Sequence, residues 1–113
     1  MKKSLLIFLL FFALTTQAKF IQGTDIPLMD NFQISESESF SFDTPAGQIM
    51  TITATTTLSE KEIYNFYQES LTALGWKKTS STAFKREQDV LNIKITPQKQ
   101  NIQITIQLTF SNK

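Results

Sequence analysis

Cysteine and histidine are both absent from this 113-residue sequence, and the two absences exclude a large part of protein chemistry. Without a thiol there is no disulfide, no cysteine nucleophile and no site for lipid attachment at cysteine. Without an imidazole the chain lacks the usual general base and the commonest zinc ligand. We therefore expect no cofactor, no metal site and no enzymatic activity, and a fold stabilised by packing alone.

Glycine and net charge are also scarce. Gly23, Gly47 and Gly75 are the only glycines, so no glycine-rich loop can cradle a phosphate. The formal net charge of +1 argues against a nucleic-acid partner and against electrostatic binding to anionic lipid.

The N-terminus carries the most informative pattern. Lys2 and Lys3 precede the apolar run 5–14, and small residues then lead up to Ala18. This order predicts a secretory signal peptide over residues 1–18, cleaved between Ala18 and Lys19. The run is shorter than the roughly 20 residues of a membrane span, so we expect no stable span after cleavage. The expected location is the periplasm, with the extracellular space as the alternative.

Removal of residues 1–18 leaves 95 residues, enough for one small domain. Nine basic and ten acidic residues then give a net charge of −1. Residues 19–36 are weakly periodic and hydrophobic in part, which predicts an extended lead-in docked on the domain surface. We assign residues 37–113 to a single α+β domain.

A helix over residues 59–74 has the clearest local signals. Ser59 with Glu62 three residues later forms a capping box, and Gly75 suits the position after the helix. Trp76 can fold back onto Leu71, so we expect its indole in the core. One face of this helix is apolar, comprising Ile63, Phe66, Tyr67, Leu71 and Leu74.

The rest of the chain alternates with the two-residue period of half-buried strands. Phe40 and Phe42 mark a first strand, a turn follows at 43–47, and residues 48–57 form a second strand. Short loops join four further strands after the helix, which predicts an antiparallel meander. The fold class is therefore α+β: a single antiparallel sheet in the order β-β-α-β-β-β-β, with one amphipathic helix packed on one face.

From Ile26 onward the sequence resembles small exported bacterial proteins of unknown function, of alphaproteobacterial type. The resemblance lies in Ile26–Met29, Phe42–Gly47, Phe66–Trp76, Phe84–Glu87 and the isoleucine-alternating end. It implies export, and it implies no activity and no site residues.

Two sets of charged residues have simple structural explanations. Glu60, Glu62 and Glu69 lie on or near the helix, where acidic residues of the first turn favour the helix dipole. The pairs 77–78 and 85–86 are basic and lie beside aromatic residues, a pattern that also occurs in single-strand nucleic-acid binders. A solvated strand face is the simpler interpretation, and contact with anionic envelope polymers or lipid headgroups is the alternative.

The outward positions of two strands carry no charge, although exposed sheet faces are usually rich in Lys and Glu. Strand propensity explains the threonines but not the missing charges. The candidate contact face comprises Thr51, Thr53, Thr55, Thr57, Gln103, Thr105, Gln107 and Thr109.

The sequence therefore indicates a small exported non-enzymatic protein that acts as a binding module in the cell envelope. Its partner would be an envelope protein or a second copy of the chain. The alternative is a periplasmic carrier that holds a small apolar ligand between helix and sheet. Such a pocket would be lined by Phe40, Phe42, Tyr64 and Tyr67.

Overall fold

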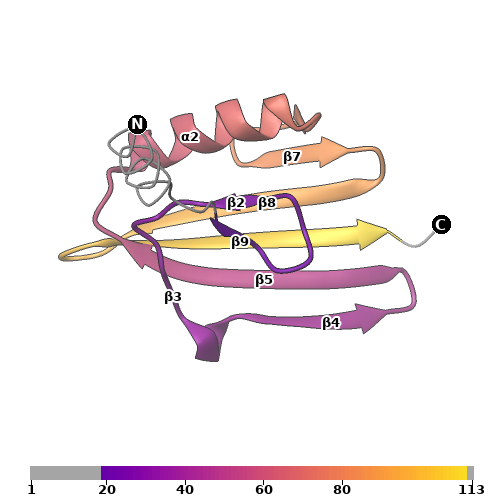
Figure 1. Cartoon of the computed structure of the whole chain (residues 1–113), viewed down its shortest axis with the longest axis horizontal. Helices are drawn as coiled ribbons and strands as arrows, with labels where there is room; N and C mark the ends of the chain where they lie inside the picture. Colours follow the sequence, from indigo (N-terminus) through magenta and orange to yellow (C-terminus); the bar gives the residue numbers. More distant parts are fainter. Residues whose placement is uncertain (1–18, 112–113) are drawn as a thin grey trace, which may run out of the picture.

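The computed structural model describes residues 19–111, so the predicted signal peptide and Ala18 lie outside the described residues. The described chain forms nine strands, one α-helix and one 3-10 turn (Figure 1). The elements are β1 (Lys19–Phe20), β2 (Pro27–Leu28), β3 (Gln33–Ile34), η1 (Glu36–Glu38), β4 (Phe40–Thr44), β5 (Gly47–Thr56), α2 (Glu60–Ala73), β6 (Lys77–Lys78), β7 (Ala83–Arg86), β8 (Asp89–Pro97) and β9 (Ile102–Ser111).

Seven of the strands form one antiparallel sheet in the order β3-β5-β9-β8-β7-β6, and β4 also pairs with β5. The strands β6 to β9 form the predicted meander, and β9 then lies beside β5. Both β3 and β4 lie along the outer edge of β5, separated by η1. The predicted α+β fold, with one helix packed on an antiparallel sheet, is confirmed. The prediction of a single sheet is corrected by β1 and β2, which pair with each other in a separate two-stranded sheet of the lead-in.

Alternation along the central strands directs their apolar side chains to one face of the sheet, which we call the near face. Ile104 of β9 lies opposite Ala54 of β5 on one side and Ile95 of β8 on the other. The near face packs against α2 and the lead-in, so all of its buried residues belong to one core. That core comprises Ile21, Ile26, Phe32, Ala54, Ile63, Tyr67, Leu71, Trp76, Phe84, Leu91, Ile93, Ile104, Ile106 and Leu108.

Both predicted ends of the helix are confirmed. The Glu62 amide donates to the Ser59 hydroxyl at 3.1 Å, and the Ser59 amide donates to the Glu62 carboxylate at 3.0 Å. At the other end Gly75 adopts φ +95°. The Trp76 amide can therefore donate to the Leu71 carbonyl at 2.9 Å. This reversal directs the Trp76 indole into the core, where it is 2% exposed.

The lead-in is an integral part of the domain, so the predicted boundary at residue 36 does not separate a domain from an appendage. Ile21, Ile26 and Phe32 are buried in the common core, and β3 is a strand of the main sheet. The Tyr67 hydroxyl of α2 donates to the Pro27 carbonyl at 2.8 Å. These contacts dock the lead-in against the helix and into the core, whereas the sequence predicts a position on the domain surface.

Candidate contact surface on the sheet

The second face of the sheet, which we call the far face, is formed by the side chains that alternate with the core residues. Six of the eight predicted contact residues lie here within the sheet and are exposed or half-buried. The register pairs Thr51 with Gln107 and Thr55 with Gln103 across β5 and β9. The six residues, which we call the Thr/Gln surface, are Thr51, Thr55, Gln103, Thr105, Gln107 and Thr109.

Two of the predicted residues do not belong to this surface. Thr53 is on the far face but is only 5% exposed, because η1 lies over it. Its hydroxyl donates to the Glu38 carbonyl at 3.1 Å, and its amide donates to the Ser39 hydroxyl at 3.1 Å. Thr57 is exposed but follows the last residue of β5, Thr56. The prediction that Thr53 is available for contact is wrong.

Phe40 and Phe42 are far-face residues that sequence reasoning placed in a half-buried strand. Their exposed fractions are 54% and 47%, and their rings stack with centroids 5.9 Å apart. The register places Phe40 opposite Thr51 and Phe42 opposite Ile49, on the side away from α2. The orientation of the two rings follows from the β4–β5 register, and that register depends on the exact length of the turn between the two strands.

Lysines are the only charged residues at far-face strand positions within residues 19–111. Lys94 lies opposite Thr105, and Lys85 lies opposite both Lys77 and Val90. Like charges directly opposite one another on a sheet are destabilising. Because the charged residues of the far face are these three lysines, its β6–β7–β8 end is electropositive, whereas the β5–β9 part is uncharged.

A hollow of about 420 Å³ adjoins the Thr/Gln surface. Four far-face residues of β8 and β9 contribute to it, together with one residue of α2, one of the β6–β7 turn and two further residues of β8. Its lining comprises Tyr64, Thr82, Asn92, Ile93, Lys94, Ile95, Thr105 and Gln107. This recess combines amide, hydroxyl and ammonium donors with an apolar wall.

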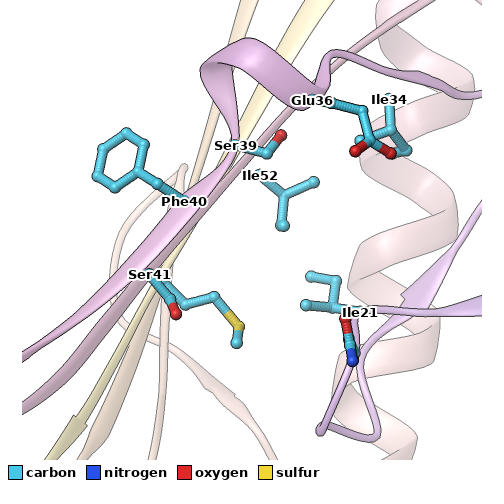
Figure 2. Close-up of a pocket in the computed structure, with 9 residues that line it drawn as sticks. Ile21, Ile34, Glu36, Ser39, Phe40, Ser41 and Ile52 are labelled. Atoms are coloured by element: carbon cyan, nitrogen blue, oxygen red, sulfur yellow. The ribbon is translucent and has the colours of Figure 1, made fainter.

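A second hollow, of about 290 Å³, lies between the lead-in and strands β4 and β5 (Figure 2). Ile21, Met50 and Ile52 contribute apolar side chains, and Glu36 lies at its border with the η1 turn. The ring of Phe40 points away from this hollow, although its backbone borders it.

The pocket predicted for the carrier alternative is not formed. Phe40 and Phe42 lie on the far face, whereas Tyr67 is buried on the near face. The Tyr67 ring packs edge-on against Phe66 at 5.0 Å and tilted against Phe32 at 6.3 Å. The four aromatic residues therefore line no common space, and core side chains fill the region between α2 and the sheet.

The basic and aromatic residues around β6 and β7 separate as the structural interpretation predicts. Trp76 and Phe84 are buried in the core, whereas Lys77, Lys78 and Lys85 are exposed. The Arg86 guanidinium lies 4.5 Å from the Trp76 ring centre, which is a cation–π contact. The aromatic rings are therefore not available as a stacking platform.

Glu62 and Tyr67 are titratable residues that make structural contacts. The amide and hydroxyl of Ser59 hydrogen-bond Glu62, and they lower the pKa of that carboxyl. Burial raises the pKa of the Tyr67 hydroxyl. Within residues 19–111, no three acidic side chains gather as a metal site would require. No helix in this range has the length and hydropathy needed to span a membrane.

Comparisons with protein families, with curated proteins and with solved structures found no match to this chain.

Proposed function

We propose that this chain is a small exported protein without catalytic activity, which acts in the cell envelope as a binding module through its far face. One observation carries the proposal. The near face is covered by α2 and the lead-in, whereas η1 buries only Thr53 among the far-face positions. The Thr/Gln surface is left with hydroxyl and amide groups that can hydrogen-bond a partner.

The charges of the far face favour an acidic partner. Lys77, Lys85 and Lys94 lie along one end of this face, and no carboxylate occupies a far-face strand position. Lys94 adjoins Thr105 and also lines the 420 Å³ recess. An acidic group bound in this recess would pair with the Lys94 ammonium, and one bound beside β6 and β7 would relieve the repulsion between Lys77 and Lys85. Binding of this type weakens as salt concentration rises.

The proposed address is the periplasm. It is supported by the order of Lys2, Lys3, the apolar run 5–14 and the small residues before Lys19. The resemblance to small exported bacterial proteins supports the same address. Without a disulfide, the exported fold depends on non-covalent contacts, and the continuous core from Ile21 to Leu108 supplies such contacts.

The experiment that tests the contact surface adds charge to it without disturbing the core. In Thr55→Glu/Gln107→Glu, two carboxylates would have to be desolvated within the contact and would also repel an acidic partner, so both effects oppose binding. We expect this variant to lose its envelope partner in co-purification from the native host. The matched control is Asn65→Glu/Thr72→Glu, which adds the same charge on exposed positions of α2.

Equal capture of the partner by wild type and by the far-face variant would contradict the proposal. The interpretation requires that both variants keep the far-UV circular dichroism of the wild type. At exposed positions each substitution changes the free energy of unfolding by only about ±0.5 kcal/mol.

Binding of a small apolar ligand is a second candidate function, now at the 290 Å³ hollow beside the lead-in. The observation that favours it is the group of apolar residues, Ile21, Met50 and Ile52, that line this hollow. Met50→Trp would fill the hollow from one wall. Titration with a fluorescent fatty-acid probe tests the candidate: saturable binding that this variant abolishes supports it, and the absence of saturable binding contradicts it.

A further inference from the structure

The two edges of the main sheet differ in a way that bears on association. The β6 edge is a two-residue strand that consists of Lys77 and Lys78, both exposed. Short length and lysine are devices that keep an edge from pairing with another strand. The β4 edge is five residues long, contains no lysine, and carries the exposed rings of Phe40 and Phe42.

Among the strands of residues 19–111, β4 pairs with β5 alone, so the backbone groups of its outer edge are available for pairing. The Thr53 carbonyl of β5 accepts from the Ser35 amide at 2.8 Å, so the Thr53 backbone points toward the β3–β4 side. Because this direction repeats every second residue, the backbones of Thr51 and Ile49 also point toward β4. Their partners Phe40 and Phe42 use their amides and carbonyls inward, and those of Ser41 and Asp43 face outward.

We propose that a second copy of this chain pairs with the β4 edge, antiparallel and about a two-fold axis that passes through Phe42. This register uses only residues of β4: Phe42 faces Phe42 of the second copy, and Ser41 faces Asp43. The outward backbone groups of Ser41 and Asp43 then meet, as an antiparallel ladder requires. The inference does not depend on the proposed envelope partner.

Avoidance of like-charge contact and of an already paired amide favours this register. Pairing centred on Asp43 would place two carboxylates opposite each other, which is unfavourable. Pairing centred on Ser41 would place Asp43 opposite Ser39, whose amide already donates to the Glu36 carbonyl at 3.4 Å. Of these three registers, the one centred on Phe42 alone avoids both conflicts and brings the four phenyl rings together on the joined far faces.

The buried area indicates a weak dimer. Two half-exposed phenylalanines on each copy contribute of the order of 400 Å² to the interface. Five paired residues add a strip of backbone and side chain, and the total stays near the lower limit of specific interfaces. We therefore expect a monomer–dimer equilibrium with a dissociation constant in the micromolar range.

Because the chain contains no cysteine, single-cysteine variants can map the pairing directly. Residues that face each other at a non-hydrogen-bonded position have Cα atoms about 4.5 Å apart, within the range that a disulfide bridges. We expect the purified Phe42→Cys protein to oxidise to a covalent dimer. In Phe40→Cys, which loses the same aromatic area, the two cysteines are too far apart for a disulfide, so no covalent dimer should form. Lys78→Cys serves as the control at the β6 edge.

Sedimentation equilibrium provides a second measurement that needs no cysteine. The wild-type protein should dimerise with increasing concentration. Phe42→Lys, which places two ammonium groups face to face, should raise the dissociation constant at least about tenfold and keep the fold. A wild type that remains monomeric at millimolar concentration would overturn the inference. Covalent dimers that form equally from Phe42→Cys and Lys78→Cys would also overturn it. Neither result bears on partner capture by the Thr/Gln surface.

Discussion

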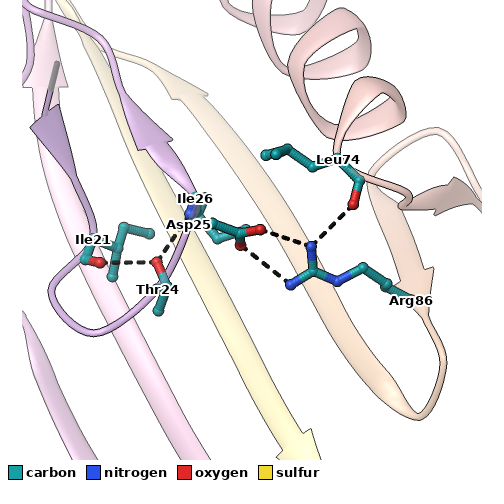
Figure 3. Close-up of polar contacts among 6 residues, drawn as sticks. All are labelled: Ile21, Thr24, Asp25, Ile26, Leu74 and Arg86. Atoms are coloured by element: carbon teal, nitrogen blue, oxygen red, sulfur yellow. Dashed lines mark hydrogen bonds and ion pairs between the residues drawn. The ribbon is translucent and has the colours of Figure 1, made fainter.

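Arg86 and Asp25, 61 positions apart in the sequence, form a two-pronged ion pair that joins the lead-in to β7 (Figure 3). The guanidinium donates to the two carboxylate oxygens at 2.9 and 3.2 Å, and also to the Leu74 carbonyl at 3.0 Å. The guanidinium also lies over the Trp76 ring. One arginine thus connects the lead-in, the end of α2 and the core.

The Asp25–Arg86 pair predicts a pH-dependent contribution to stability. The hydrogen bonds from Arg86 lower the pKa of Asp25. A carboxyl whose pKa is lowered by folding stabilises the fold above its unfolded pKa, near 3.9, and this contribution is lost as the pH falls through the folded value. Because the Asp25 side chain is 48% exposed, we expect less than about 1 kcal/mol from the pair.

Urea unfolding of Asp25→Asn at pH 7 and at pH 2 checks this expectation. The variant should be less stable than the wild type at pH 7 and equal to it at pH 2. Asp30→Asn is the control, because the Asp30 side chain has no hydrogen bond or ion pair within residues 19–111, and it should have little effect at either pH. An unchanged deficit for Asp25→Asn at pH 2 would contradict the assignment.

The burial of Trp76 predicts a large loss of stability when its side chain is truncated. Trp76→Ala should cost about 3–5 kcal/mol in the free energy of unfolding, because it leaves a cavity where α2 turns into β6. Lys77→Ala, at the exposed neighbouring residue, should cost less than about 0.5 kcal/mol. A loss below about 1 kcal/mol for Trp76→Ala would mean that the indole is not a core residue.

Glycine is required at position 47 for two reasons, the close approach of the Phe110 backbone and the backbone angle of the residue itself. Its φ is +150°, and a Cβ built there would collide with the backbone carbonyl of Phe110 on the neighbouring strand. We expect Gly47→Ala to cost at least about 3 kcal/mol. Gly23→Ala, with φ +80° but nothing within 4 Å of the added Cβ, should cost about 1 kcal/mol. Equal costs in thermal or urea unfolding would contradict this account.

Processing of the N-terminus is predicted to occur after Ala18. N-terminal sequencing of the protein isolated from the envelope should begin at Lys19. A mature pool that begins at Met1 would show that the apolar run 5–14 is retained, and the proposed address would then have to be abandoned.

The sequence predicts those parts of the fold that depend on neighbouring residues. Ser59, Glu62 and Gly75 specify both ends of α2 within a few positions, and the alternation from Ile102 to Phe110 specifies the core side of β9. The burial of Thr53 could not be predicted, because its cover is the Glu38 carbonyl of a turn that precedes it by 15 residues. Hydrophobicity alone would assign Phe40 and Phe42 to the core. Their exposure depends on the register of β4 with β5.

The most direct test of the central claim, that the far face is the functional contact surface, is photocrosslinking in intact cells. A photoreactive p-benzoylphenylalanine at Gln107, on the Thr/Gln surface, should form a covalent adduct with an envelope component, and Lys94→Glu should reduce its yield. The same residue at Gln68, on the exposed side of α2, should form none. Adducts from Gln68 but not from Gln107 would contradict the account and would place the contact surface on the helix.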